Sequence, residues 1–266
     1  MKTKLKAELL REMHRGIEPL LLVNAWDAIS ARVCEAQGFT AVATGSAGCA
    51  AVLGYADGQK IPQAEMLMLV AAMARAVEVP VTADVEAGYG DAAATAQDLW
   101  RAGVVGMNLE DYAGGRLFPI EEAVANIKAI RAAVPAMVIN ARTELYLVKH
   151  GEASTRFARA VGRLNAYFEA GADCLFAPGV SDAETIGRLA AAVKGPLNIL
   201  ATVGTPPIAE LKRLGVRRVS FGSGPSRVAL GAYRRIARSI RDMGTFDALT
   251  TEAIPYAEVQ KMLARG

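Results

Sequence analysis

The chain has 266 residues, of which 52% are hydrophobic, and its 30 basic and 27 acidic residues leave a formal charge of +3. A single domain spanning 1–266 can bury a large core at this length. The scattered, balanced charges exclude a basic surface for nucleic acid. Residues 1–15 lack the apolar segment of a signal peptide, and no run of about 18 apolar residues could span a membrane. The three cysteines are odd in number and not closely spaced, which is typical of a reducing compartment. Together these features predict a cytoplasmic protein.

Apolar, β-branched runs alternate with helical patterns along the whole chain. Strands are expected at about 20–26, 40–45, 80–86, 104–110, 136–142, 173–177, 197–202 and 217–222. Helices are expected at about 28–37, 64–77, 92–102, 120–134, 154–170, 182–193, 206–214 and 226–243. Eight such units favour an α/β fold of the closed (β/α)8 TIM barrel type over an open sheet. Residues 244–266 form a C-terminal extension beyond the eighth unit.

Acidic residues gather at the carboxyl ends of neighbouring predicted strands, where the catalytic groups of such barrels lie. Asp84 and Glu86 end the third strand on one face, Glu110 ends the fourth, and Asp57 follows the second. Carboxylates this close repel one another unless they share a cation, and an all-oxygen set suits Mg²⁺ or Mn²⁺. Helix caps and loop ion pairs are the alternative roles, and they suit Asp111 best because it points away from Glu110.

Other polar residues are expected at the same end of the barrel. Arg142 either holds a substrate carboxylate with two parallel hydrogen bonds or serves as a counter-ion for Glu110 or Glu144. The small residues at 44–48 let backbone N–H groups approach an anion. The segment 222–226 is either a phosphate-binding helix start or an ordinary glycine-rich turn.

Together these motifs resemble those of the isocitrate lyase/phosphoenolpyruvate mutase superfamily, from about Leu21 to the eighth strand. The resemblance is carried by Thr44-Gly45-Ser46, Leu53-Gly54-x-x-Asp57, Asp84-Val85-Glu86-Ala87-Gly88-Tyr89-Gly90, Asn108-Leu109-Glu110-Asp111 and Asn140-Ala141-Arg142-Thr143. It implies that Asp84 ligates Mg²⁺ or Mn²⁺, and that water links the ion to Asp57, Glu86 and Glu110.

The resemblance also implies a small 2-oxo acid as substrate, whose enolate is stabilised by the metal when a bond at C3 breaks. The residues expected to bind the substrate are Trp26, Thr44, Gly45, Ser46, Ala47, Arg142 and Asn198. Catalytic roles are expected for Arg142, Tyr89 and Glu110. Helix-exchanged homodimers paired into homotetramers are implied as well, and the amphipathic stretch 256–263 could add to that contact.

The chain departs from the family pattern directly after Glu110. Lyases of the family carry a gating loop there with a Lys-x-Cys-Gly-His motif, whose cysteine is the acid/base, and the mutases carry Lys-x-Asn-Ser. Residues 111–119 contain neither motif, and Phe176 stands where the family has a histidine. The metal and oxo-acid half that remains is sufficient to decarboxylate an oxaloacetate-like acid, because loss of CO2 does not require a cysteine acid.

Three alternatives stay open. Another C–C bond could be cleaved with Tyr55, Tyr89 or Tyr112 as the proton donor. A P–C bond mutase or hydrolase would act on a phosphonopyruvate-like substrate. A non-catalytic protein would only bind a 2-oxo acid.

The missing loop predicts that isocitrate and 2-methylisocitrate are poor substrates. General acid catalysis contributes about 10²–10⁴-fold, and residues 112–118 offer no thiol or imidazole. Cleavage should therefore be slower than that of a true lyase by about the same factor, as measured by release of glyoxylate or pyruvate. Rapid glyoxylate release from isocitrate would contradict this prediction.

Overall fold

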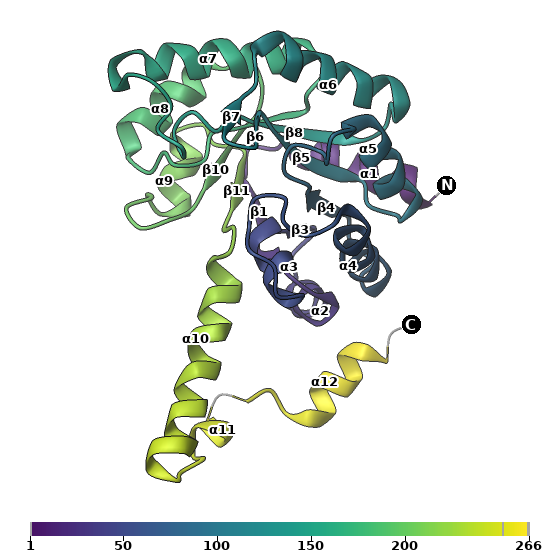
Figure 1. The fold of residues 1–266 in the computed structure, drawn as a ribbon, viewed down its shortest axis with the longest axis vertical. Helices are drawn as coiled ribbons and strands as arrows, with labels where there is room; N and C mark the ends of the chain where they lie inside the picture. The colour runs from purple at the N-terminus through teal and green to yellow at the C-terminus, as the bar shows by residue number, and fades with distance from the viewer. Residues whose placement is uncertain (1, 252, 265–266) are drawn as a thin grey trace.

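The computed structural model describes residues 2–251 and 253–264, and its strands form one parallel sheet that curls into a nearly closed barrel (Figure 1). The strands are β1 Leu20–Leu22, β2 Asn24–Ala25, β3 Val42–Thr44, β4 Val81–Asp84, β5 Gly106–Glu110, β8 Val138–Arg142, β9 Cys174–Phe176, β10 Leu197–Leu200 and β11 Arg218–Ser220. Their order is β1-β11-β10-β9-β8-β5-β4-β3-β2. Because β1 and β2 are halves of one extended segment, the barrel closes there. The predicted TIM barrel is confirmed, with shorter strands.

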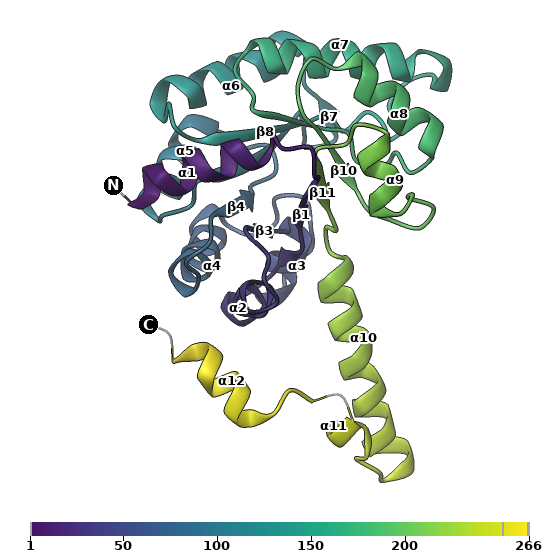
Figure 2. The ribbon, with the colours of Figure 1, turned by 180° about the vertical axis from the view of Figure 1, so that it is seen from behind.

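Helices surround the barrel on its outer side (Figure 2). The helices around the barrel are α2 Ala28–Ala36, α4 Gln63–Ala76, α5 Ala92–Arg101, α6 Ile120–Ala133, α7 Ala153–Glu169, α8 Ala183–Ala192 and α9 Ile208–Arg213. The helix that follows β11, α10 Gly224–Arg238, does not pack around the barrel. A short helix, α3 Ser46–Val52, and a small antiparallel hairpin, β6 Tyr112–Ala113 with β7 Arg116–Leu117, were outside the sequence-based prediction. Both follow strand ends directly, so they shape the mouth of the barrel.

Helix α1, Lys2–Met13, is also absent from the sequence-based prediction, because its charged sequence shows little apolar periodicity. Its Ala7 and Leu10 are fully buried against the amino-terminal ends of the strands. The fit is close: a Cβ on Gly106 would lie 2.8 Å from Leu10 Cδ2 and 2.8 Å from Thr82 Oγ1. The helix therefore closes the floor of the barrel, opposite the mouth.

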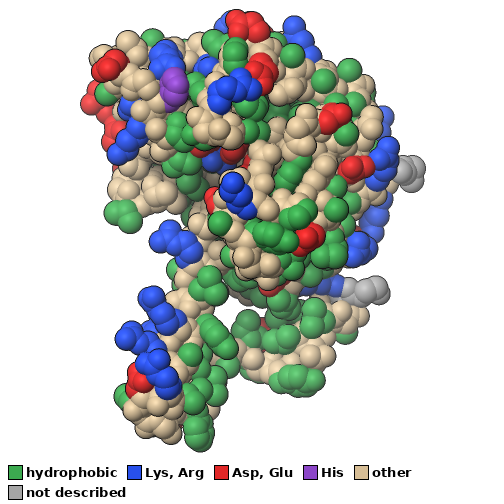
Figure 3. Space-filling model, viewed as in Figure 1, with side chains coloured by type: hydrophobic (Ala, Val, Ile, Leu, Met, Phe, Trp, Pro, Cys, Tyr) green, Lys and Arg blue, Asp and Glu red, His purple; other side chains and the backbone are tan. Residues whose placement is uncertain are grey.

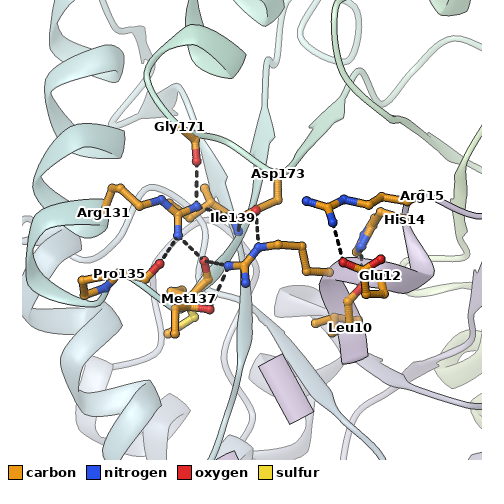
Figure 4. Close-up of polar contacts among 12 residues, drawn as sticks. Leu10, Glu12, His14, Arg15, Arg131, Pro135, Met137, Ile139, Gly171 and Asp173 are labelled. Atoms are coloured by element: carbon orange, nitrogen blue, oxygen red, sulfur yellow. Dashed lines mark hydrogen bonds and ion pairs between the residues drawn. The ribbon is translucent and has the colours of Figure 1, made fainter. Parts of the chain in front are cut away.

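Ionic contacts fasten this floor (Figure 4). Asp173, directly before β9, accepts hydrogen bonds of 2.7 Å from Arg11 of α1 and 2.7 Å from Arg131 of α6. The same carboxylate accepts from the backbone N–H of Ile139 in β8 at 2.8 Å. One half-buried carboxylate thus joins two helices and a strand.

Helix α10 leaves the barrel and extends away from it, followed by the π-helix η1 Ser239–Met243, α11 Ala248–Thr251 and α12 Tyr256–Leu263 (Figures 1 and 3). Apolar side chains along this segment are exposed, including Val228, Tyr233 and Tyr256 at 73%, 72% and 79%. Helix α12 returns to lie beside α2. Residues 252, 265 and 266 of the predicted extension, and Met1, lie outside the described residues. No described helix is both long and apolar enough to cross a bilayer.

Folding should become less stable in mild acid because of His14. This buried ring contacts Leu10 O through Nδ1 at 2.7 Å, and Arg218 Nη1 lies 3.4 Å from its Nε2. Burial, followed by the charge of Arg218, lowers the His14 pKa to about 4. The unfolded chain binds this proton below about pH 6.5 and the folded chain does not, so about 2 kcal/mol should be lost between pH 7 and 5.

Urea unfolding of the wild type and of His14→Gln at pH 7 and 5 measures this effect. Glutamine can still donate a hydrogen bond to Leu10 O, but it does not titrate. The free energy of unfolding of the variant should therefore depend less on pH, by about the same 2 kcal/mol. An equal dependence in both proteins would rule out His14 as the cause.

Candidate active site at the barrel mouth

A cavity of about 170 Å³ opens at the carboxyl ends of the strands. Pockets for drug-sized ligands usually measure roughly 300–1,000 Å³, so this cavity suits a small acid better than a bulky one. It is lined by Asn24, Gly45, Ser46, Ala47, Asp57, Asp84, Asn108, Arg142, Leu147, Phe176, Pro178, Leu200, Ser220, Gly222 and Ser223. Elements from all around the barrel contribute to it.

Half of the predicted site residues line this cavity, and the others lie behind it or beside it. The lining ones are Gly45, Ser46, Ala47, Asp57, Asp84 and Arg142. Thr44 is fully buried, and its hydroxyl accepts a hydrogen bond from the backbone N–H of Asp84 at 2.9 Å. Asn198 is fully buried 3.4 Å from the hydroxyl of Ser220, and Trp26 packs close to Gly48 of α3. These three shape the lining from behind.

Glu86 reaches the mouth by a different route from the one predicted. Strand β4 ends at Asp84, so strand alternation does not place Glu86; its backbone has a left-handed φ of 52° in the turn that follows. The side chain is only 3% exposed, and its Oε1 has no hydrogen-bond partner. Burial, followed by the charges of Asp84 and Asp57, raises the pKa of Glu86 to about 7. An unpartnered, buried carboxylate oxygen is what a missing cation would leave.

Arg142 lies at the centre of the acidic cluster. Its Nη1 is 3.2 Å from Glu110 Oε2 and 3.6 Å from Asp84 Oδ2, and its Nε donates to Glu144. Burial would lower the pKa of Arg142, but these carboxylates outweigh burial and raise it. Burial also raises the pKa of Glu110 well above its usual value, assisted by Glu144 and Asp84 and opposed by Arg142. The counter-ion role considered for Arg142 is therefore present in this structure.

Asp111 has the structural role expected from its direction. Its carboxylate is 1% exposed and accepts hydrogen bonds from Arg163 at 2.9 Å, from the hydroxyl of Tyr167 at 2.6 Å and from the backbone N–H of Glu144 at 2.9 Å. Since these contacts occupy both of its oxygens, Asp111 anchors the start of the β6–β7 hairpin to α7. It also holds the backbone beside Arg142.

The carboxylates at the mouth fit a hard divalent cation. Within the described part of the chain, no three His, Cys, Asp or Glu side chains stand close enough together to form a complete metal site. Water and substrate would therefore supply part of the shell, as is usual for Mg²⁺. The all-oxygen donor set and the unpartnered oxygen of Glu86 are both consistent with such an ion.

The three tyrosines considered as proton donors differ in their surroundings. The hydroxyl of Tyr55 donates to Glu65 at 3.1 Å. Tyr89 has a left-handed φ of 55°, its buried hydroxyl has no partner, and burial together with Glu86 and Asp84 raises its pKa. Tyr112 lies on the hairpin strand β6. Tyr89 is thus the one of the three whose hydroxyl is both buried and unpartnered.

An apolar wall also lines the cavity, and sequence reasoning did not assign it. It consists of Leu147, Phe176, Pro178 and Leu200. The guanidinium of Arg142 lies 5.6 Å from the centre of the Phe176 ring. The motif Phe176-Ala177-Pro178, where the family has a histidine, is the signal that could have revealed this wall. The cavity lining therefore combines acidic and apolar side chains, with Phe176 directly beside Arg142.

Asn24 is another lining residue that sequence reasoning missed. Its Oδ1 accepts hydrogen bonds from the backbone N–H groups of Phe221 and Gly222, both at 2.8 Å, and its Nδ2 donates to Thr44 O at 2.8 Å. It therefore ties the loop after β11 to the end of β3. A polar residue within an apolar strand was the available signal.

Comparison with known proteins places the chain among lyases and mutases. The family model described as phosphoenolpyruvate phosphomutase matches residues 10–241. A 2-methylisocitrate lyase of Halalkalibacterium halodurans is 30% identical over 258 residues, which is 91% of this chain and 84% of the relative. An oxaloacetate decarboxylase of Chromohalobacter salexigens is 33% identical over 250 residues, covering 88% and 84%. A crystal structure of a candidate lyase/mutase from Burkholderia cenocepacia superposes with a TM-score of 0.91 at 35% identity, covering 99% and 97%.

Replacing Arg142 with methionine should destabilise the protein, because Glu110 and Glu144 would remain buried without their cation. Breaking a buried ion pair costs about 3–5 kcal/mol. Added Mg²⁺ should restore part of this loss if it binds among the same carboxylates. The control is Arg188→Met, which removes an exposed arginine that also lies over a phenylalanine, Phe157, at 4.4 Å. Thermal unfolding with Mg²⁺ and with chelator measures both variants, and a variant Arg142→Met as stable as the control would refute the prediction.

Proposed function

Because the chain belongs to the phosphoenolpyruvate phosphomutase family, we propose that it is a Mg²⁺-dependent lyase that binds a small 2-oxo acid and breaks a bond at C3 through an enolate. The leading reaction is decarboxylation of an oxaloacetate-like acid. Mn²⁺ is the alternative ion. A lyase or mutase activity agrees with the relatives, among which are proteins named oxaloacetate decarboxylase and 2-methylisocitrate lyase.

The observation that carries this proposal is that the carboxylates at the mouth outnumber Arg142, the arginine that forms ion pairs with them. Asp57, Asp84, Glu86 and Glu110 would hold the ion, directly or through water. Among the described residues, Arg142 is the cation within ion-pair distance of Asp84 and Glu110, and it also pairs with Glu144. When bound, a divalent cation supplies the positive charge that stabilises an enolate oxygen.

The remaining residues would bind and orient the acid. Gly45, Ser46 and Ala47 line the cavity; the Gly45 N–H donates to Ala25 O at 3.3 Å, so the backbone N–H groups of Ser46 and Ala47, in the first turn of α3, would bind the carboxylate of the substrate. Arg142 would keep Glu110 in place and offer the free edge of its guanidinium to the substrate. Tyr89, with its unpartnered hydroxyl, would deliver the proton to C3.

The apolar wall favours loss of CO2 as the bond-breaking step. A second carboxylate of the substrate placed against Phe176, Pro178 and Leu200 would be poorly solvated while it is charged. Its departure as neutral CO2 would relieve that cost. The negative charge would then remain on the enolate oxygen, where the bound ion would stabilise it.

One observation favours the second candidate, a reaction at a P–C bond. Gly222 and Ser223 line the cavity immediately before α10, which is where a phosphate-binding helix start would meet a ligand. A phosphonopyruvate-like acid would then place its phosphonate there.

We propose further that the working form is a homodimer or homotetramer in the cytoplasm. The exposed apolar side chains of α10 and the following helices support the assembly, since burial of such a surface against a second copy is favourable. Helix exchange, as the resemblance implies, would bury the same residues.

Pyruvate formation from oxaloacetate tests the function. With Mg²⁺ the protein should exceed the rate of Mg²⁺ alone, and Asp84→Asn, which keeps the size of the side chain, should fall to that background. Chelator should abolish the difference. Turnover of phosphonopyruvate without that of oxaloacetate would select the P–C reaction. Binding of oxalate with no turnover of any 2-oxo acid would indicate a non-catalytic binding protein.

A further inference from the structure

Asn108 lies on β5 at the floor of the cavity, and its side chain is held by two donors. It is 5% exposed and lines the cavity. Its Oδ1 accepts a hydrogen bond from Asn140 Nδ2 at 2.8 Å and another from Arg218 Nη2 at 3.1 Å. The strand register places Asn108 beside both Asn140 and Asp84. Asn108 is therefore a polar neighbour of the acidic cluster, one layer of side chains deeper in the barrel than Glu110 and Arg142.

Arg218 approaches Asn108 from the opposite side of the barrel. It belongs to β11, which is not a neighbour of β5 in the sheet, and its side chain is 1% exposed. Among the described residues, no carboxylate lies within ion-pair distance of its guanidinium; its other contact is with the ring of His14 at 3.4 Å. Burial lowers the pKa of Arg218, and Cys174 and Asp84 oppose this effect only in part. A buried arginine without an ion-pair partner is costly, so its retention here requires a reason.

These two contacts determine which way the Asn108 amide faces. An arginine carries only hydrogen-bond donors, so the amide oxygen must point toward it. Turning the amide over would bring its NH2 group against the cationic N–H groups of Arg218. The Nδ2 group is consequently directed away from Arg218, and it has no hydrogen-bond partner among the described residues.

We propose that Asn108 donates a hydrogen bond from Nδ2 to an oxygen of the bound acid, and that Arg218 and Asn140 are positioning residues that hold the amide in this orientation. The inference rests on the proposed function, since the ligand is the 2-oxo acid bound at the same mouth. A neutral donor is useful there because Arg142 already contacts three carboxylates. A fixed dipole directed at an oxygen that gains negative charge stabilises that charge without reorganisation.

Binding of oxalate in the presence of Mg²⁺, measured by calorimetry, tests the donor. Asn108→Asp keeps both acceptor contacts but replaces the donor with an anion, and Asn108→Leu removes the donor without adding charge. Both should weaken oxalate binding by about 10- to 10²-fold, the usual scale for loss of one hydrogen bond to a charged group. The control is Asn165→Asp, at an asparagine that donates to Ala192 O outside the cavity, and it should bind like the wild type. Weakening in Asn108→Asp alone would indicate charge repulsion and overturn the proposal.

A double-mutant cycle tests the positioning role without any ligand. In Asn108→Asp the new carboxylate faces Arg218, so Arg218→Met should then reduce the folding equilibrium constant roughly 10-fold more than it does in the wild type. Additive effects in urea unfolding would overturn the assigned contact. If the wild type binds no oxalate, the proposed function fails, while the cycle still decides whether Arg218 orients Asn108.

Discussion

The ion cluster centred on Arg142 is the constraint around which the barrel mouth is built. One guanidinium from β8 contacts carboxylates from β4, β5 and the loop after β8, and all of them are largely buried. Buried charges are tolerated only when they are paired and hydrogen-bonded. Because one cation faces several carboxylates, the cluster is still acidic after Arg142 has been counted. The same imbalance, which costs stability, is what the proposed divalent ion would offset.

The two ends of the barrel have opposite tasks, and a polar layer connects them. Helix α1 and the Asp173 contacts close the floor, while the short α3 and the β6–β7 hairpin surround the mouth. Between them, Asn108, Asn140 and Arg218 occupy positions that barrels usually fill with branched apolar side chains. Polar groups at this depth cost stability unless they form hydrogen bonds. Their presence therefore suggests a role in the ligand site above them.

The cavity lining combines acidic side chains with an apolar wall, and this combination bears on the reaction. Asp84 and Asp57 provide charged groups in the cavity, whereas Phe176, Pro178 and Leu200 offer no hydrogen bond or opposite charge to a charged leaving group. A small acid that loses a neutral leaving group is consistent with both the acidic and the apolar part of the lining.

Much of the fold was readable from the sequence because its signals are local. Hydrophobic runs, with the glycines and prolines between them, placed all eight strands to within a few residues, and the same alternation placed Asp84, Glu110 and Arg142 at one end. Helix α1 was missed because its few apolar residues become meaningful only against the barrel floor. Glu86 was placed at the mouth by strand alternation, but strand β4 ends at Asp84. The left-handed turn that contains Glu86 could not be predicted, because a glutamate gives no sequence signal for such a backbone.

Only the closed barrel decided how these residues act on one another. The sequence by itself determined which chemical groups stand at the strand ends, because strand period and residue type are properties of short segments. Three contacts depend on the tertiary structure: the carboxylates around Arg142, the Phe176 ring beside the Arg142 guanidinium, and Arg218 against the amide of Asn108. Each joins residues far apart in the chain, and Arg218 and Asn108 meet across strands that are not neighbours. No local pattern records such a contact, because it exists only once the sheet has curled and brought its opposite sides within the reach of a side chain.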